Sequence, residues 1–367
     1  MKKILFIFGT RPEAIKLFPL IKKMRSKPRQ FKTIICVTGQ HRTMLDQVMN
    51  LFDISSDYDV AIMEKDQSLG RLSEKLFGSI GIILDKEKPD CIIVQGDTTS
   101  AFITSLIAFY HKIPIAHIEA GLRSFDKYQP FPEEINRSLI SRVADFHFAP
   151  TQKSKKNLRK EGINASSIFV TGNTIIDALQ LIKKKLDFNK LPLTIDPKKK
   201  LILVTAHRRE SFGKPIANIC RALQLLAHRN EDIEIVYPVH LNPNVQKVVY
   251  PMLKNRTRIR LLKPLDYFQI LTLISKSYLI ITDSGGIQEE APSFHKPVLV
   301  LRNVTERPEG VERGIAKIVG TDTTTIVKNT EYLLKNPNAY KKMVNKKNPY
   351  GDGHAAERIV KIIAQAL

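Results

Sequence analysis

The sequence predicts an α/β fold with two domains, each built on a parallel sheet that helices cover on both faces. The 367 residues are enough for two domains of ordinary size. Short apolar runs rich in β-branched residues alternate with segments of helical spacing, which is typical of parallel sheets with two buried faces. The alternation breaks near residues 187–199 and then starts again.

Each apolar run that ends in small or polar residues is interpreted as a strand. The first half contains such runs at 4–8, 33–37, 91–94, 113–118, 146–149 and 168–170. The second half contains them at 201–204, 233–236, 259–262, 279–281, 297–301 and 316–319. We therefore expect a first domain at 1–186, a linker at 187–199, a second domain at 200–353, and a C-terminal helix at 354–367 that rejoins the first domain.

Composition narrows the class of protein. The net charge of +22 invites a nucleic-acid interpretation. However, the lysine runs flank helices or loops and lack interleaved aromatic residues, so we expect a solvated, lysine-rich surface that attracts anionic substrates. No apolar run reaches the roughly 18 residues that span a membrane. Cys36, Cys91 and Cys220 lack metal-ligand spacing and lie in apolar stretches, which indicates core residues in a reducing, cytoplasmic compartment.

In such sheets, ligands bind beyond the carboxyl ends of the strands. The first strand is followed by Gly9, which suits a tight turn, and by a helix start that carries Arg11 and Lys16. Free N–H groups and cations at a helix start favour an anion, although an ordinary turn with incidental charges is the alternative. The dinucleotide-binding pattern of glycines is absent, which argues against a nicotinamide enzyme.

Carboxylates follow the next strands of the first half. Asp97 follows the strand at 91–94, Glu119 follows the strand at 113–118, and Glu133 and Glu134 stand at another helix start. Asp97 alternatively caps a helix, and the glutamate pair alternatively complements a helix dipole. Three carboxylate positions at one sheet edge together predict acid–base chemistry.

The second half offers groups that suit a nucleotide. His207 and the adjacent arginines follow the strand at 201–204, and forked guanidinium groups match a diphosphate. Ser284, Gly285 and Gly286 open a helix whose N–H groups suit phosphate, and Glu290 suits the hydroxyls of a ribose. Arg307 lies in a loop after the strand at 297–301, whereas His240 is equally consistent with a core or capping histidine.

The motifs closely resemble those of the non-hydrolysing UDP-N-acetylglucosamine 2-epimerases, nearly end to end. The matching blocks are 9–16 (GTRPEAIK), 39–47 (GQHRTMLDQ), 96–99 (GDTT), 117–123 (HIEAGLR), 132–137 (PEEINR), 171–178 (TGNTIIDA), 207–211 (HRRES), 237–244 (YPVHLNPN), 282–292 (TDSGGIQEEAP), 305–308 (TERP) and 348–353 (NPYGDG). The resemblance implies a GT-B-like fold of two Rossmann-like domains, with the active site in the cleft between them. It also implies a cytoplasmic homodimer that needs no cofactor or metal.

The implied activity is reversible epimerisation at C2 between UDP-N-acetylglucosamine and UDP-N-acetylmannosamine, through elimination and re-addition of UDP, for cell-surface polysaccharide synthesis. Asp97, Glu119 and Glu133 would be the acid–base carboxylates, with His207 beside the departing diphosphate. The implied substrate-binding residues are Arg11, Lys16, Asp97, Glu119, His207, Ser284, Gly285, Gly286, Glu290 and Arg307. A regulatory site would involve Gln40, Glu134, Arg209 and His240, but Thr43 and Asp66 depart from the glutamine and arginine expected there.

Three other interpretations remain. A GT-B glycosyltransferase shares the fold and the ribose-binding acid but leaves the three carboxylates unexplained. A hydrolysing epimerase would release free N-acetylmannosamine and UDP. A nucleic-acid-binding protein is suggested by the charge alone, and neither nucleic acid nor a membrane is an expected partner.

Overall fold

The computed structural model describes residues 1–39, 42–62, 64, 67–183, 186–187 and 191–367. The chain divides into two compact units, of which unit 1 comprises Met1–Leu181 with Tyr350–Leu367, and unit 2 comprises Ile182–Pro349. Unit 2 therefore begins before the predicted linker at 187–199, and the return to unit 1 begins at Tyr350, before the predicted helix at 354–367.

Unit 1 is built on a seven-stranded parallel sheet in the order β3-β2-β1-β4-β5-β6-β7. Its strands are β1 (Lys2–Phe8), β2 (Phe31–Val37), β3 (Tyr58–Asp59), β4 (Cys91–Gln95), β5 (Ile115–Ile118), β6 (Phe146–Ala149) and β7 (Ile168–Val170). Its helices are α1 (Arg11–Arg25), α2 (Arg42–Leu51), α3 (Leu69–Glu87), α4 (Thr99–Tyr110), α5 (Glu133–Val143), α6 (Gln152–Lys160), α7 (Thr174–Lys183) and α15 (Ala355–Ala366).

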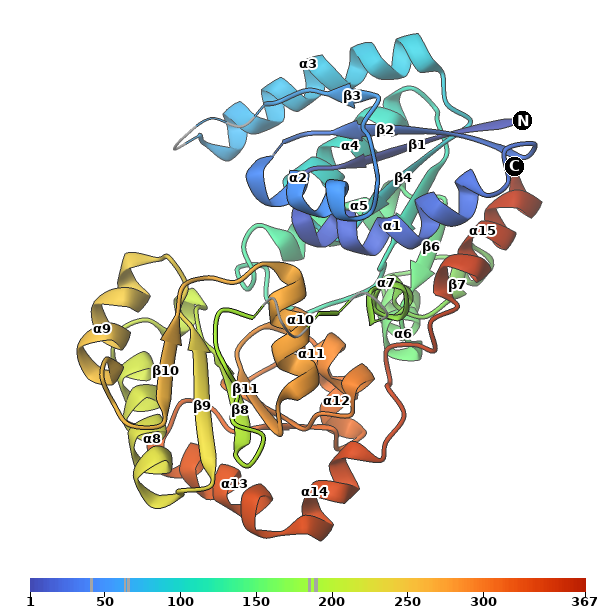
Figure 1. Ribbon diagram of the computed structural model, residues 1–367. Coiled ribbons are helices and arrows are strands. Elements are labelled where there is room, and N and C mark those ends of the chain that lie inside the picture. The colour runs from blue at the N-terminus through green and yellow to red at the C-terminus, as the bar shows by residue number, and fades with distance from the viewer. Residues whose placement is uncertain (40–41, 63, 65–66, 184–185, 188–190) are drawn as a thin grey trace. The chain divides into compact units, whose positions relative to one another are not determined.

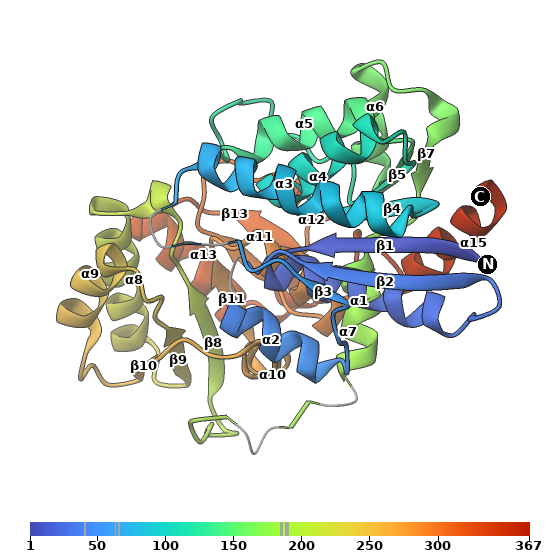
Figure 2. The same cartoon turned by 90° about the horizontal axis from the view of Figure 1, so that it is seen from above.

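Strand β1 shows why this sheet forms. All its residues from Ile4 to Phe8 are buried, because helices cover both faces. Leu5 and Ile7 pack in a core with α3 and α4. Helices α3, α4 and α5 lie on one face of the sheet, and α1 and α2 lie on the other (Figures 1 and 2). Helix α15 packs beside α1, so both chain ends belong to unit 1.

Unit 2 has a six-stranded parallel sheet in the order β10-β9-β8-β11-β12-β13. Its strands are β8 (Lys200–Thr205), β9 (Ile233–Pro238), β10 (Ile259–Leu262), β11 (Leu279–Thr282), β12 (Val298–Val300) and β13 (Ala316–Ile318). Its helices are α8 (Lys214–Arg229), α9 (Pro243–Leu253), α10 (Tyr267–Lys276), α11 (Gly285–Glu290), α12 (Pro308–Glu312), α13 (Thr323–Lys335) and α14 (Pro337–Val344).

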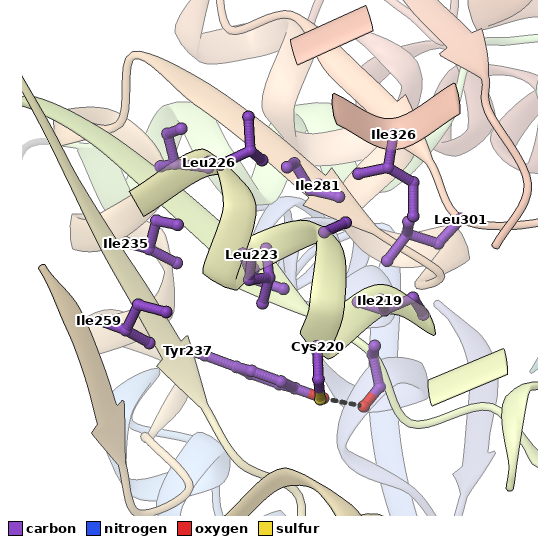
Figure 3. Packing of buried hydrophobic residues seen from close by; sticks show 14 of the residues in the cluster. Ile219, Cys220, Leu223, Leu226, Ile235, Tyr237, Ile259, Ile281, Leu301 and Ile326 are labelled. Carbon is purple, nitrogen blue, oxygen red and sulfur yellow. Dashed lines mark hydrogen bonds between the residues drawn. The ribbon is translucent and has the colours of Figure 1, made fainter. Parts of the chain in front are cut away.

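The core of unit 2 forms where α8 packs on the sheet. Cys220 and Leu223 of α8 lie against Tyr237 of β9 and Ile281 of β11 (Figure 3). All three cysteines are buried with free thiols, as predicted for core residues. Burial raises the pKa of the Cys220 thiol to about 12, so this thiol is unreactive near neutral pH.

The strand order of each sheet reverses once, between β1 and β4 in unit 1 and between β8 and β11 in unit 2. In open parallel sheets, the loops that leave such a pair of strands diverge to opposite faces, and ligands bind at the carboxyl edge between them. Arg11 and Asp97 follow the first strand pair, and His207 and Ser284 follow the second. These four predicted residues therefore lie at the switch points of their sheets. Among the described residues, no helix has both the length and the apolar character needed to cross a bilayer.

Candidate active site

Hydrogen bonds tie together the two turns at the switch point of unit 1. Thr10 caps α1, and Glu13 completes a capping box by accepting the Thr10 N–H at 2.8 Å. Glu13 also accepts the Gly9 N–H at 3.1 Å and the Thr98 hydroxyl at 2.8 Å. Glu13 is buried, and burial raises the pKa of its carboxyl against the effect of these hydrogen bonds. The turn that carries Arg11 is thus joined to the turn that carries Asp97.

Glu119 is held by three donors directly after β5. Its Oε1 accepts from Lys16 Nζ at 2.5 Å and from Asn173 Nδ2 at 2.9 Å. Its Oε2 accepts from Gln95 Nε2 at 2.5 Å. Glu119 has a φ of +66°, a left-handed conformation that costs a residue with a side chain roughly 1–2 kcal/mol. These contacts therefore fix the orientation of the Glu119 carboxylate, although the backbone of Glu119 is strained.

Asp97 lies beside Glu119 and is bound to α5. A Cβ at Gly96, the preceding residue, would lie 3.9 Å from Glu119 Oε2. The Asp97 carboxylate forms an ion pair with Arg137 Nη2 at 2.5 Å, and its backbone carbonyl accepts from Asn136 Nδ2 at 3.0 Å. The turns after β4 and β5 are therefore neighbours, as predicted from their strands.

Glu133 is the first residue of α5, the helix that carries Arg137. Its Oε2 is buried and has no hydrogen-bond partner among the described residues. Glu134 instead accepts the N–H groups of Ser124 and Phe125 at 3.0 and 2.9 Å, so it orders the loop before α5. Arg11 is half-buried, and its side chain makes no hydrogen bond or ion pair within the described part of the chain, which leaves its guanidinium available to a ligand.

In unit 2, the buried Asp283 joins the ends of β8 and β11. Its Oδ2 accepts the N–H groups of His207 and Arg208 at 2.7 and 2.8 Å, and its Oδ1 lies 3.4 Å from His207 Nδ1. Tyr237 of β9 donates to the carbonyl of Ala206 at 2.7 Å (Figure 3), which fixes the residue before His207. The His207 backbone is therefore held from two neighbouring strands.

The His207 ring stacks on His240, with centroids 5.1 Å apart. Burial lowers the pKa of His207, and the Asp283 carboxylate, which acts in the opposite direction, does not cancel this effect. His207 is therefore mainly neutral near pH 7 and can accept a proton or donate one hydrogen bond.

Cationic side chains converge on Gly285, the first residue of α11. A Cβ there would lie 3.0 Å from Glu306 Oε1, 3.8 Å from Arg208 Nη2 and 3.9 Å from Arg307 Cζ. Partial burial of Glu306 opposes its ionisation, but Arg307, Arg302 and Arg208 lower the pKa of its carboxyl to about 2. Ser284 and Gly286, on either side of Gly285, are half-buried and exposed. Gly285 itself is buried, and the absence of a side chain there leaves room for Glu306 and the two arginines beside the start of α11.

Glu290 and Arg307 are both held within unit 2. Tyr267 donates its hydroxyl to Glu290 Oε1 at 2.9 Å, and Arg307 Nε donates to Glu289.

Of the predicted regulatory residues, Gln40 and the side chain of Arg209 lie outside the described residues, as do Asp66 and the side chain of Thr43. Glu134 belongs to unit 1 and His240 to unit 2.

Among the residues that contact the predicted ones, sequence reasoning did not single out Gln95, Arg137, Asn173 or Asp283. The rule that polar residues follow strands could have found Asp283, which directly follows β11, and Gln95, which ends β4. Within the described residues, no group of three or more histidines, cysteines and acids could hold a metal ion.

A family model described as UDP-N-acetylglucosamine 2-epimerase matches residues 22–364. The UDP-N-acetylglucosamine 2-epimerase of Campylobacter jejuni is 50% identical over 374 residues, covering 99% of this chain and 97% of its own. The chain belongs to the UDP-N-acetylglucosamine 2-epimerase family. The family predicted from the motifs is thereby confirmed.

Two solved structures are similar to this member of the epimerase family. The UDP-GlcNAc 2-epimerase of Neisseria meningitidis, bound to UDP-GlcNAc, is 46% identical and has a TM-score of 0.92, covering 99% of this chain and 100% of its own. Acinetobacter baumannii MurG covers 100% of both chains with a TM-score of 0.59 at 15% identity, a likeness of fold alone. The α/β, GT-B-like fold class with two parallel sheets is confirmed.

Proposed function

We propose that the chain interconverts UDP-N-acetylglucosamine and UDP-N-acetylmannosamine without net hydrolysis. Its family membership and the carboxylates at the ends of β4 and β5 support this proposal. The observation that carries it is the Glu119 carboxylate, which three donors orient beside the turn of Asp97. An oriented buried acid beside a second acid suits proton transfer at carbon.

The reaction proceeds by elimination, because no carbonyl acidifies the C2–H bond. The C1–O bond breaks and its electron pair leaves with UDP, while a carboxylate of unit 1 takes the C2 proton, which gives 2-acetamidoglucal. A second acid then protonates C2 from the opposite face, and UDP adds back at C1. Asp97, Glu119 and Glu133 supply these groups, and no co-substrate is consumed.

Unit 2 binds the UDP part of the substrate. Arg208, Arg307 and the backbone at Ser284–Gly286 are proposed to contact the diphosphate, and Glu290 the ribose. His207 is proposed to donate a hydrogen bond to the diphosphate, which stabilises the negative charge that develops as UDP departs. Such preorganised donors can each contribute about 3 kcal/mol to lowering the barrier. In unit 1, Arg11 and Lys16 are the proposed substrate-binding cations.

The test is to incubate the protein with UDP-N-acetylglucosamine alone in heavy water and to follow the sugar by proton NMR. We expect the UDP-linked manno isomer to appear with deuterium at C2. Asp97→Asn and Glu119→Gln should each lower turnover by at least 100-fold while UDP still binds, because only the acid–base step is removed. Near wild-type turnover in either variant would refute these roles.

The same incubation separates the rival activities. A glycosyltransferase, which the MurG-like fold alone favours, would leave the nucleotide sugar unchanged without an acceptor. A hydrolysing epimerase would release free N-acetylmannosamine and UDP.

We further propose a cytoplasmic homodimer that supplies N-acetylmannosamine units to cell-surface polysaccharides. Exposed Phe109 and Tyr110 of α4, with Phe77 of α3, form an aromatic face that suits a second copy of the chain. Light scattering on the purified protein measures this state directly.

A further inference from the structure

The amide of Asn173 makes two hydrogen bonds that fix its orientation. Its Nδ2 donates to Glu119 Oε1 at 2.9 Å, and its Oδ1 accepts the N–H of Ile175 at 3.1 Å in the first turn of α7. The side chain is buried. The oxygen that caps the helix leaves the NH₂ group directed at Glu119, so the two contacts support each other.

The backbone of Asn173 is held by the C-terminal segment of the chain. Its N–H donates to the carbonyl of Tyr350 at 2.7 Å, and Tyr350 itself is buried. A Cβ at Gly351, whose φ is +154°, would lie 3.3 Å from Asn173 N. Only a residue without a side chain therefore fits this approach comfortably.

Further bonds fasten the same segment along α7. Asp177 accepts the N–H groups of Ala355 and Ala356 at 3.2 and 2.8 Å, and Gln180 donates to the carbonyl of Asp352 at 3.0 Å. The segment Tyr350–Ala356, which we call the C-terminal strap, is thus bound to α7 at several points beyond Asn173.

We propose that Asn173 is a positioning residue for the Glu119 carboxylate and that the C-terminal strap holds Asn173 in place. The inference rests on the proposed role of Glu119 and extends it. Lys16 also contacts Glu119 Oε1 from α1, whereas the amide of Asn173 is fixed at both its oxygen and its nitrogen. Without that anchor, the strained residue Glu119 has fewer fixed contacts to set the direction of its carboxylate.

The variant Asn173→Ser tests this, because a serine hydroxyl still caps α7 but does not reach Glu119. We expect kcat to fall roughly 10- to 100-fold, the effect of losing one hydrogen bond to a charged group. The KM for UDP-N-acetylglucosamine and the Kd for UDP should stay within about threefold, because the uridine part is not affected. The control is Asn164→Ser, since the exposed Asn164 caps a short helix through Ser166 N at 3.1 Å in the same way. It should leave kcat unchanged.

Two further variants separate positioning from general destabilisation. In a Glu119→Gln background, Asn173→Ser should lower the residual turnover by less than twofold, because its effect acts through Glu119. Gly351→Ala should lower kcat in the folded protein, with KM little changed, because its methyl group displaces Asn173.

The inference is overturned if Asn173→Ser keeps kcat within twofold of wild type, or if it costs the same factor with and without Glu119. Failure of the proposed function is a distinct result, because the wild-type protein would then form no manno isomer before any variant is compared.

Discussion

At the scale of single residues, His117 shows how burial makes folding depend on pH. It lies in the middle of β5, fully buried, with Nε2 2.7 Å from the Gly96 carbonyl. Burial lowers its pKa to about 3, against roughly 6.5 in an unfolded chain. Between these values the unfolded chain binds a proton that the folded chain does not. Stability from this residue is therefore complete above pH 6.5 and decreases as the pH falls.

The expected contribution is about 1.4 kcal/mol per pH unit below pH 6.5. His117→Gln should reduce the slope of the unfolding free energy against pH by about 1.4 kcal/mol per pH unit between pH 6.5 and 5. Urea unfolding followed by circular dichroism measures this slope. The raised pKa values of Glu13 and Asp177 act in the opposite direction but are common to both proteins. His228→Gln, at an exposed position in α8, is the matched control. An unaltered slope in His117→Gln would contradict the assignment.

At the scale of elements, Gly121 sets the approach of the loop after β5 to helix α6. Its φ is +90°, and a Cβ would lie 2.3 Å from the Ser154 carbonyl and 2.9 Å from Leu158 Cγ. Gly121→Ala should therefore lower the unfolding free energy by roughly 3 kcal/mol, because helix backbone cannot move aside. Gly162→Ala, with a φ of +82° but no atom within 4 Å, should cost only about 1 kcal/mol. Equal losses in denaturant titrations would show that backbone conformation, not packing, governs both sites.

Helices and strands could be predicted from the sequence where a short stretch of residues carries the pattern. Every apolar run interpreted as a strand overlaps an observed strand, because burial on both faces demands continuous apolar sequence. Strand β3 was not predicted, since two residues at a sheet edge carry no pattern. The rule that ligand-binding polar residues follow strands identified Asp97 and Glu119 as candidates, but it did not identify the residues that contact them. Arg137 and Asn173 come from elements 40 and 54 positions later, respectively, and only tertiary packing selects them.

At the scale of the whole molecule, each sheet places its proposed site residues along one edge. The acids Asp97 and Glu119 belong to unit 1, whereas the cationic groups around Gly285 belong to unit 2. The order of strands explains this distribution, because each sheet reverses its order only once. The sequence alone could indicate two such edges, since each domain repeats the same alternation of strand and helix.

The net charge of +22 also belongs to this scale. A surface with this excess of lysine and arginine raises the local concentration of a diphosphate, and salt screens that attraction over a Debye length of about 10 Å at 0.1 M. Raising sodium chloride from 0.05 to 0.5 M should therefore weaken UDP binding roughly tenfold by calorimetry. Uridine, which lacks the diphosphate, should bind with little dependence on salt. Equal salt dependence for the two ligands would show that the charge acts on protein conformation rather than on the anionic group, because only UDP carries the charge that the surface attracts.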